Sequence, residues 1–292
     1  MNKKRTIVVA LAFLMLVSVI VLGAAPAEDV DDEDENDTDG YIVRDPIRID
    51  GNDDFAAQAA AEGWPGDGSE GDPYVIEGYE IDGTGYGYGI YVGNTTVYFI
   101  VRNCYVHNAS GYDWSGYNGI PTQIGVLNSG IILLNVENGV LTNNTLADNY
   151  RAINFRRSEN NLISKNTLSS NVFGISSADS RYNIVSFNDI NGSSSSGGAI
   201  WLQGCDYNIL SNNTMSNYRI GILGINSFDN EIENNMFSNV ETEIEFIEMV
   251  ENGNETNGDK IPTSVFAFFV IVVLVVITVI WKKKDKIKEL KK

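Results

Sequence analysis

The sequence predicts an all-β protein, a right-handed parallel β-helix solenoid, from its repeats, its short apolar runs and its tolerance of one insertion. A motif of Asn, any residue and a bulky apolar residue, followed by a Gly-Ile, Ala-Ile or Glu-Ile step, recurs at intervals of 22, 22, 25 and 22 residues. The apolar runs lack a helical period and are rich in Ile, Val, Leu and Phe, which favours strands. The long interval contains extra residues at 193–198, so the period absorbs a longer loop, as stacked repeats do. Each repeat has about the length of one β-helix coil.

Equivalent residues of successive coils are expected to stack about 4.8 Å apart, the spacing of paired strands. Asparagine suits the turns, because it tolerates left-handed backbone and its amides can bond to one another along the axis. The asparagine columns are Asn144, Asn166, Asn188, Asn213 and Asn235, and Asn161, Asn183, Asn208 and Asn230. A small polar column contains Ser158, Ser180, Cys205 and Ser227. The expected interior columns are Ile153, Ile175, Ile200, Ile222 and Ile244, and Leu146, Leu168, Ile190, Met215 and Phe237.

The same spacing continues upstream, so the solenoid is expected over residues 73–250, with roughly seven coils. Residues 108–128 exceed the period and predict a loop that leaves the solenoid between two coils. Three aromatic residues of this loop, Tyr112, Trp114 and Tyr117, are candidates for ligand binding, since aromatic side chains recur at recognition surfaces. The alternative is that they pack the loop onto the solenoid.

The first 72 residues predict three segments. Residues 1–27, with a basic start, an apolar stretch and an Ala-Pro-Ala site, are expected to be a secretory signal peptide or, alternatively, an uncleaved anchor. Residues 28–44 are predicted to be an acidic disordered linker. Residues 45–72 are predicted to form an N-terminal cap on the first coil, with a short Ala-rich helix that begins at Asp53 or Asp54.

The C-terminal residues predict attachment to a membrane. Residues 251–264 are a polar linker, and residues 265–281 are 17 uncharged, mostly apolar residues, just long enough for a transmembrane helix. Residues 282–292 contain seven lysines, which predicts a basic cytoplasmic tail. The β-helix is therefore expected outside the cell, tethered by a single C-terminal span of the cell membrane.

The charge of the chain disfavours polyanions as partners. Three of its 20 Lys and Arg residues lie in the predicted signal and seven in the tail, and two of its 39 acids lie in the tail. The exported portion therefore has 10 basic and 37 acidic residues, a net charge near −27. This charge disfavours nucleic acid and acidic polysaccharide.

The two cysteines are expected to be free thiols. Cys104 occupies an asparagine position of an early coil, and Cys205 occupies a serine position several coils later. Stacking at about 4.8 Å per coil places them beyond the roughly 7 Å between Cα atoms that a disulfide allows.

Glycosylation sequons indicate a glycoprotein if the chain is exported. The best candidates lie in predicted loops or linkers and are Asn36, Asn108, Asn191 and Asn254.

The segment from Ile47 to Glu77, with the runs IRIDGN and GWPGDGSEGDPY, resembles the N-terminus of archaeal surface proteins with a NosD-type right-handed β-helix domain. The stretch from Gly89 to Cys104, and the asparagine repeats, are similar to the same family. The resemblance covers about residues 45–246 and implies the fold. It implies copper handling in the periplasm for some relatives, and carbohydrate binding or hydrolysis for others.

The residues offer little for metal chemistry or catalysis. A copper site needs clustered His, Cys or Met, whereas the chain has one histidine, His107, and two separated cysteines, so no metal site is expected. Ca²⁺ is the one candidate cofactor, since Asp and Asn gather at the turns without a tight loop motif. Asp179 and Asp206, one coil apart, are the candidate carboxylates of a polysaccharide hydrolase or lyase, and solvated turn residues are the alternative interpretation.

The sequence thus predicts a membrane-tethered extracellular β-helix with a binding or structural role at the cell envelope. Surface glycans or other envelope proteins are the expected partners, with carbohydrate binding as the leading activity. The alternatives are a carbohydrate-active enzyme and a NosD-like copper-associated protein.

Overall fold

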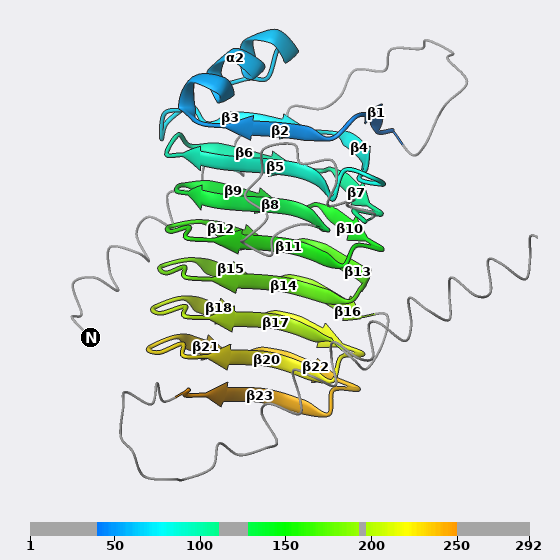
Figure 1. The fold of residues 1–292 in the computed structure, drawn as a ribbon, viewed down its shortest axis with the longest axis vertical. Coiled ribbons are helices and arrows are strands. Elements are labelled where there is room, and N and C mark those ends of the chain that lie inside the picture. The colour runs from blue at the N-terminus through cyan, green and yellow to red at the C-terminus, as the bar shows by residue number, and fades with distance from the viewer. Residues whose placement is uncertain (1–39, 111–127, 193–196, 250–292) are drawn as a thin grey trace, which may run out of the picture. The chain divides into compact units, whose positions relative to one another are not determined.

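The computed structural model describes residues 40–110, 128–192 and 197–249 of the chain. They form three parallel sheets in which each strand pairs with its equivalents in the coils before and after it (Figure 1). Sheet I contains β1 (Ile42–Arg44), β4 (Tyr79–Asp82), β7 (Tyr105–His107), β10 (Thr145–Ala147), β13 (Thr167–Asn171), β16 (Asp189–Gly192), β19 (Thr214–Ser216) and β22 (Met236–Ser238). Sheet II contains β2 (Ile47–Asp50), β5 (Tyr88–Thr95), β8 (Ser129–Val136), β11 (Arg151–Arg156), β14 (Phe173–Ala178), β17 (Gly198–Gln203), β20 (Ile220–Ile225) and β23 (Thr242–Ile247). Sheet III contains β3 (Tyr74–Glu77), β6 (Phe99–Arg102), β9 (Gly139–Thr142), β12 (Leu162–Ser164), β15 (Ile184–Ser186), β18 (Ile209–Ser211) and β21 (Glu231–Glu233).

Each coil contributes one strand to each sheet in turn. Coil 1 consists of β1, β2 and β3, coil 7 of β19, β20 and β21, and β22 and β23 belong to coil 8. The described residues therefore confirm an all-β parallel solenoid of about seven turns.

The strand register confirms the predicted interior columns, although Ile244, in the last coil, is 45% exposed. Ile153 pairs with Ile175, which pairs with Ile200 across the longer interval, so the insertion does not shift the register. These three side chains are fully buried and belong to one continuous apolar core. A loop can lengthen without disturbing that core because the neighbouring coil contacts only the strands.

Buried asparagines hold the corner between sheets III and I. The side-chain oxygen of Asn166 accepts the backbone N–H of Asn144 at 3.1 Å and the side-chain N–H of Asn144 at 3.0 Å. The side-chain nitrogen of Asn166 donates to the carbonyl of Leu141 at 3.0 Å and to Asn188 at 2.9 Å. One side chain thus satisfies polar groups of two coils in a place that water does not reach.

Further ladders of this kind hold the other corners. Asn161, Asn183 and Asn208 form the second predicted ladder, between sheets II and III. A third, between sheets I and II, joins Asn149 to Asn171, and the sequence did not reveal it because only these two residues continue the column.

The left-handed backbone lies one position earlier than predicted. The ladder asparagines are not left-handed, whereas the residues directly before them are, with φ of 54° at Asn143, 58° at Lys165 and 57° at Asn212. The left-handed residue bends the chain, its own side chain lies at the outside of the corner, and the next side chain enters the interior. Bending the chain and bonding along the axis are therefore tasks of two adjacent residues.

The stack begins before residue 73. Strands β1 and β2 pair with β4 and β5, because Ile47 and Ile49 continue the interior columns of Ile90 and Val92. The predicted helix is α2 (Asn52–Glu62), which begins before Asp53 and follows Gly51 without a side-chain cap.

Helix α2 lies between β2 and β3 in sequence and at the N-terminal end of the stack in space (Figure 1). Its Phe55 is fully buried and stacks on Tyr74 with ring centroids 5.0 Å apart.

Several predicted segments lie outside the described residues. They are the signal peptide at 1–27, most of the acidic linker at 28–44, the aromatic loop with Tyr112, Trp114 and Tyr117, the linker at 251–264, the span at 265–281 and the tail at 282–292. Across residues 40–110, 128–192 and 197–249, no helix combines the length and apolar character that crossing a membrane requires.

Replacement of Asn166 by Ala is predicted to lower the free energy of unfolding by about 2–4 kcal/mol, because the backbone N–H of Asn144 and the carbonyl of Leu141 lose buried partners. Chemical denaturation followed by circular dichroism measures this change. The matched control is Thr167→Ala at the next, exposed position, with an expected effect below about 0.5 kcal/mol. Equal effects of the two substitutions would contradict the role of the ladder.

Candidate functional site

Three aromatic residues of coils 5 and 6 have a backbone conformation that their side chains disfavour. Tyr182, Phe187 and Tyr207 have φ of 58°, 57° and 57°. The same column as the two tyrosines contains Asn160, a residue type that adopts left-handed backbone readily. For other side chains this conformation costs ~1–2 kcal/mol per residue. Such strain persists where the surrounding structure imposes it, and it is concentrated at functional sites.

We give the name aromatic strip to these three residues together with two isoleucines of sheet III: Tyr182, Ile184, Phe187, Tyr207 and Ile209. The rings of Tyr182 and Tyr207 stack with centroids 5.6 Å apart and planes 15° apart. Phe187 follows the other end of β15 and is 53% exposed, and Tyr207 is 44% exposed. Ile184 and Ile209 pair between the two edges of the strip and are half-buried. Apolar and aromatic surface is therefore available to a ligand over two coils.

Charged side chains border the strip at the corner between sheets II and III. Arg181 lies 2.8 Å from Glu159 of the preceding coil, and its guanidinium carbon is 5.9 Å from the ring centroid of Tyr182. The hydrogen bond to Glu159 and the charge of that carboxylate raise the pKa of Arg181. A hydrogen bond to Asp229, and then its charge, raise the pKa of the Tyr207 hydroxyl. The border thus offers both donors and acceptors beside the aromatic rings.

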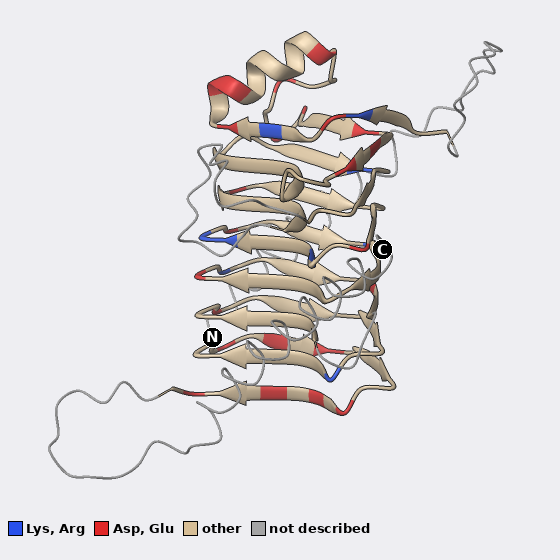
Figure 2. Ribbon diagram, turned by 45° about the vertical axis from the view of Figure 1, so that its right-hand side comes forward, with Lys and Arg blue, Asp and Glu red and all other residues tan. Residues whose placement is uncertain are grey.

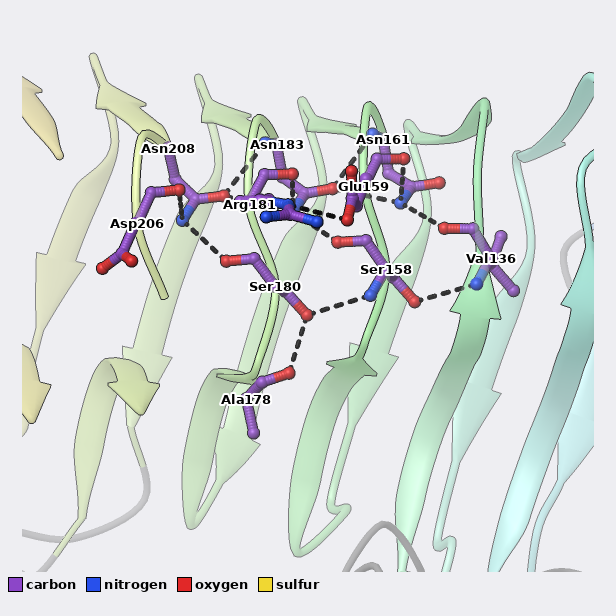
Figure 3. Close-up of polar contacts among 10 residues, drawn as sticks. All are labelled: Val136, Ser158, Glu159, Asn161, Ala178, Ser180, Arg181, Asn183, Asp206 and Asn208. Carbon is purple, nitrogen blue, oxygen red and sulfur yellow. Dashed lines mark hydrogen bonds and ion pairs between the residues drawn. The ribbon is translucent and has the colours of Figure 1, made fainter. Parts of the chain in front are cut away.

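The ladders lie directly behind this corner and hold it in place (Figure 3). Glu159 lies between Ser158 and Asn161 in sequence, and both of these residues bond to the next coil. Arg181 lies between Ser180 and Asn183 in the same way. The backbones of Glu159 and Arg181 are joined by a parallel bridge. The outward side chains therefore stand on a backbone whose position the buried bonds determine.

The structure does not pair the two predicted catalytic carboxylates with each other. Asp179 lies 3.3 Å from Arg156, and its left-handed backbone places it in the outer turn column. Asp206 accepts the backbone N–H of Phe228 at 2.8 Å and so is directed toward coil 7, whereas Arg181 is directed toward coil 4 (Figure 3). The two acids share one corner but have separate partners.

Two of the glycosylation candidates can be placed. Asn108 is exposed at a left-handed corner, with its side-chain nitrogen 2.8 Å from Nδ1 of His107. Asn191 is exposed on β16, and its side-chain oxygen accepts from Asn217 at 2.7 Å. Asn36 and Asn254 lie outside the described residues.

The possible copper ligands are dispersed. His107 lies 3.3 Å from Glu80 and stacks on Tyr105 with centroids 4.6 Å apart. Cys104 and Cys205 are free and buried in the ladders, as predicted, between three and four coils and therefore more than about 14 Å apart along the axis. Over the described ranges, no group of three or more His, Cys, Asp or Glu side chains is arranged to hold a metal ion.

Comparison with known families identifies the repeat. A family model described as NosD, periplasmic copper-binding protein, matches residues 69–256, more than half of the chain. The chain belongs to the NosD family. Among the residues that the structure describes, the candidate ligands do not gather into a site for the copper named in that description, because Met215 is a core side chain and Met236 is exposed on the outside of sheet I, apart from both cysteines.

The solved structures that match this NosD-family chain resemble it only weakly. No curated protein matches it. A proposed glycosyl hydrolase from Parabacteroides merdae has a TM-score of 0.41 and 13% identity, over 69% of this chain and 93% of that one. Jun a 1, the major allergen from cedar pollen, has a TM-score of 0.30 and 12% identity, over 63% and 68% of the two chains. Similarity at this level indicates neither a ligand nor an activity.

Both thiols are predicted to be unreactive in the folded protein. Burial raises the pKa of Cys104 to about 11 and also raises the pKa of Cys205, so both stay protonated near pH 8 and lack the nucleophilic thiolate. A thiol-specific chromogenic disulfide should label neither cysteine before unfolding in guanidinium and both afterwards. Rapid labelling of the native protein, or a Cys104–Cys205 bridge in the intact mass, would contradict this ladder assignment.

Proposed function

We propose that the protein binds carbohydrate at the cell envelope without transforming it, and that the aromatic strip is its binding surface. The observation that carries the proposal is the strained backbone of Tyr182, Phe187 and Tyr207. Asparagine would serve the corner geometry at lower cost, as Asn160 does one coil earlier. The rings therefore have a use that coil geometry does not explain.

The chemistry of the strip suits a sugar. An aromatic ring offers a flat apolar face to the C–H groups of a pyranose, and Tyr adds a hydroxyl that can hydrogen-bond. Arg181 supplies donors and Glu159 acceptors within reach of the same ligand. The strong negative charge of the exported portion favours a neutral glycan over an acidic one.

The proposed setting is the outer side of a cell membrane. The family description names the periplasm, and the basic start of the chain and its apolar C-terminal segment suit export followed by single-pass anchoring. In this proposal the tail is cytoplasmic, α2 covers the first coil as a cap, and Asn108 and Asn191 are glycosylation candidates. The resemblance in the N-terminal segment favours an archaeal surface, with surface glycans or other envelope proteins as partners.

A carbohydrate-active enzyme was the alternative from the sequence. Asp179 and Asp206 engage Arg156 and the backbone of Phe228, so their observed contacts do not favour a catalytic pair. The proposal therefore assigns the site to recognition, with neither a metal nor another cofactor.

Replacement of Tyr182 and Tyr207 by Asn is predicted to weaken glycan binding by about tenfold or more while leaving stability unchanged or higher. The aromatic contacts are lost, whereas Asn relieves the left-handed strain. A glycan array followed by calorimetry on the best ligand, with thermal denaturation of each variant, measures both effects.

The matched control is Tyr86→Asn, which changes a 42% exposed tyrosine near the start of β5 and should leave binding unchanged. Binding that survives in the double variant would refute the site. Release of shorter saccharides by the native protein, abolished by Asp179→Asn or Asp206→Asn, would instead establish the enzyme.

A further inference from the structure

Among the described residues, the strand edges at the C-terminal end of the stack have no partner strand. Strands β21, β22 and β23 are the last members of the three sheets, so each pairs on one side only. The next coil would lie below them, and the strands of the described chain end at Ile247. Unpaired edges of this kind are templates for pairing with another chain.

The apolar interior is accessible at the same end. Ile222 is fully buried, whereas its neighbour below in the column, Ile244, is 45% exposed. Phe246 lies below Gly224 in the next interior position and is also 45% exposed. The end of the solenoid therefore combines free backbone groups with apolar side chains, the two features that favour addition of another coil.

The other end differs, because helix α2 lies there. Phe55 is fully buried against Tyr74 and Phe99. A second copy could not stack its C-terminal end on this surface without displacing the helix. Two like ends, each with an accessible β23, are the pairing that remains.

Figure 2 shows acidic residues on the last strands of the stack, and also on helix α2 and the first coils at the other end. Residues 226–247 contain six Asp and Glu and no Lys or Arg. The preceding 22 residues, 204–225, contain one acid and one base. The six acids are Asp229, Glu231, Glu233, Glu241, Glu243 and Glu245.

Glu243 stands in a column that contains only Gly or Ala from coil 2 to coil 7. Its counterparts are Ala199 and Ala152, which are fully buried in the core, and Gly221 directly above it. A charged residue in an inward position of the last strand prevents the interior from closing against another chain. The acids affect one another even within one copy, since burial and then the charge of Glu233 raise the pKa of Glu231.

We propose that the acids of residues 226–247 keep the protein from associating tail to tail with a second copy, in which β23 would pair with its symmetry mate. An interface between two identical ends brings each patch against itself, so every glutamate would face the acids of the partner. Juxtaposed like charges of this kind oppose association. Without them, the accessible Ile244 and Phe246 and the free edge of β23 would favour a closed dimer.

The test is Glu243→Gln/Glu245→Gln in the full chain, compared with the native chain by sedimentation velocity in one detergent. The variant is expected to dimerise at a concentration at least about tenfold lower than the native chain does. Adding Phe246→Lys to the same variant should abolish the gain, because it places a charge in the proposed interface. In the native chain, association should strengthen at an ionic strength of about 1 M, where the Debye length falls to about 3 Å.

The matched control is Glu137→Gln/Asp189→Asn, which makes the same change in net charge at exposed positions away from this end. An equal gain in the control would overturn the proposal, since general self-repulsion would then be the cause. A folded Glu243→Gln/Glu245→Gln variant that dimerises no more readily than the native chain would also overturn the proposal. That result would indicate that residues after 247 cover the end. Circular dichroism shows whether each variant is folded.

Discussion

The whole structure depends on hydrogen bonds that buried side chains make along the axis. Every corner of the solenoid turns the chain sharply, and a sharp turn leaves backbone N–H and C=O groups without strand partners in a place that water does not reach. One amide side chain at a corner solves this locally, as Asn166 does by accepting from Asn144 and donating to Leu141. Because each ladder residue bonds to its equivalent in the next coil, the coils must keep the same length except where a loop leaves the stack.

The ladders restrict the choice of residue type more strongly at some corner positions than at others. The residue before a ladder asparagine must adopt left-handed backbone. Its side chain lies outside the corner, so the core does not restrict which chemical groups it contains. Asn143 and Asn160 meet the conformational demand at little cost, whereas Tyr182 and Tyr207 meet it against their preference. The aromatic strip is recognisable only against this background, because an exposed tyrosine elsewhere on a protein needs no explanation.

The repeat of a solenoid ends at its first and last coils, and the two ends of this solenoid differ in structure. At the N-terminal end, Phe55 of α2 is buried against side chains of the first coils. At the other end, Ile244 and Phe246 are each 45% exposed, and residues 226–247 contain six acids and no base. Contacts reach only neighbouring coils, so each end affects stability locally and both matter for solubility.

The period, the interior columns and two of the ladders followed from the sequence, because stacking converts sequence distance into spatial position: Ile175 lies over Ile200 whatever the loop between them does. The tertiary structure alone decided that the left-handed residue precedes the ladder asparagine, that β1 and β2 already belong to the stack, and that Asn149 and Asn171 form a further ladder. It also decided the candidate site, since the left-handed backbone of Tyr182 and Tyr207 and the stacking of their rings appear only in the structure. Repetition determines which residues stack, whereas side-chain direction and strain at a corner depend on backbone angles that no period encodes.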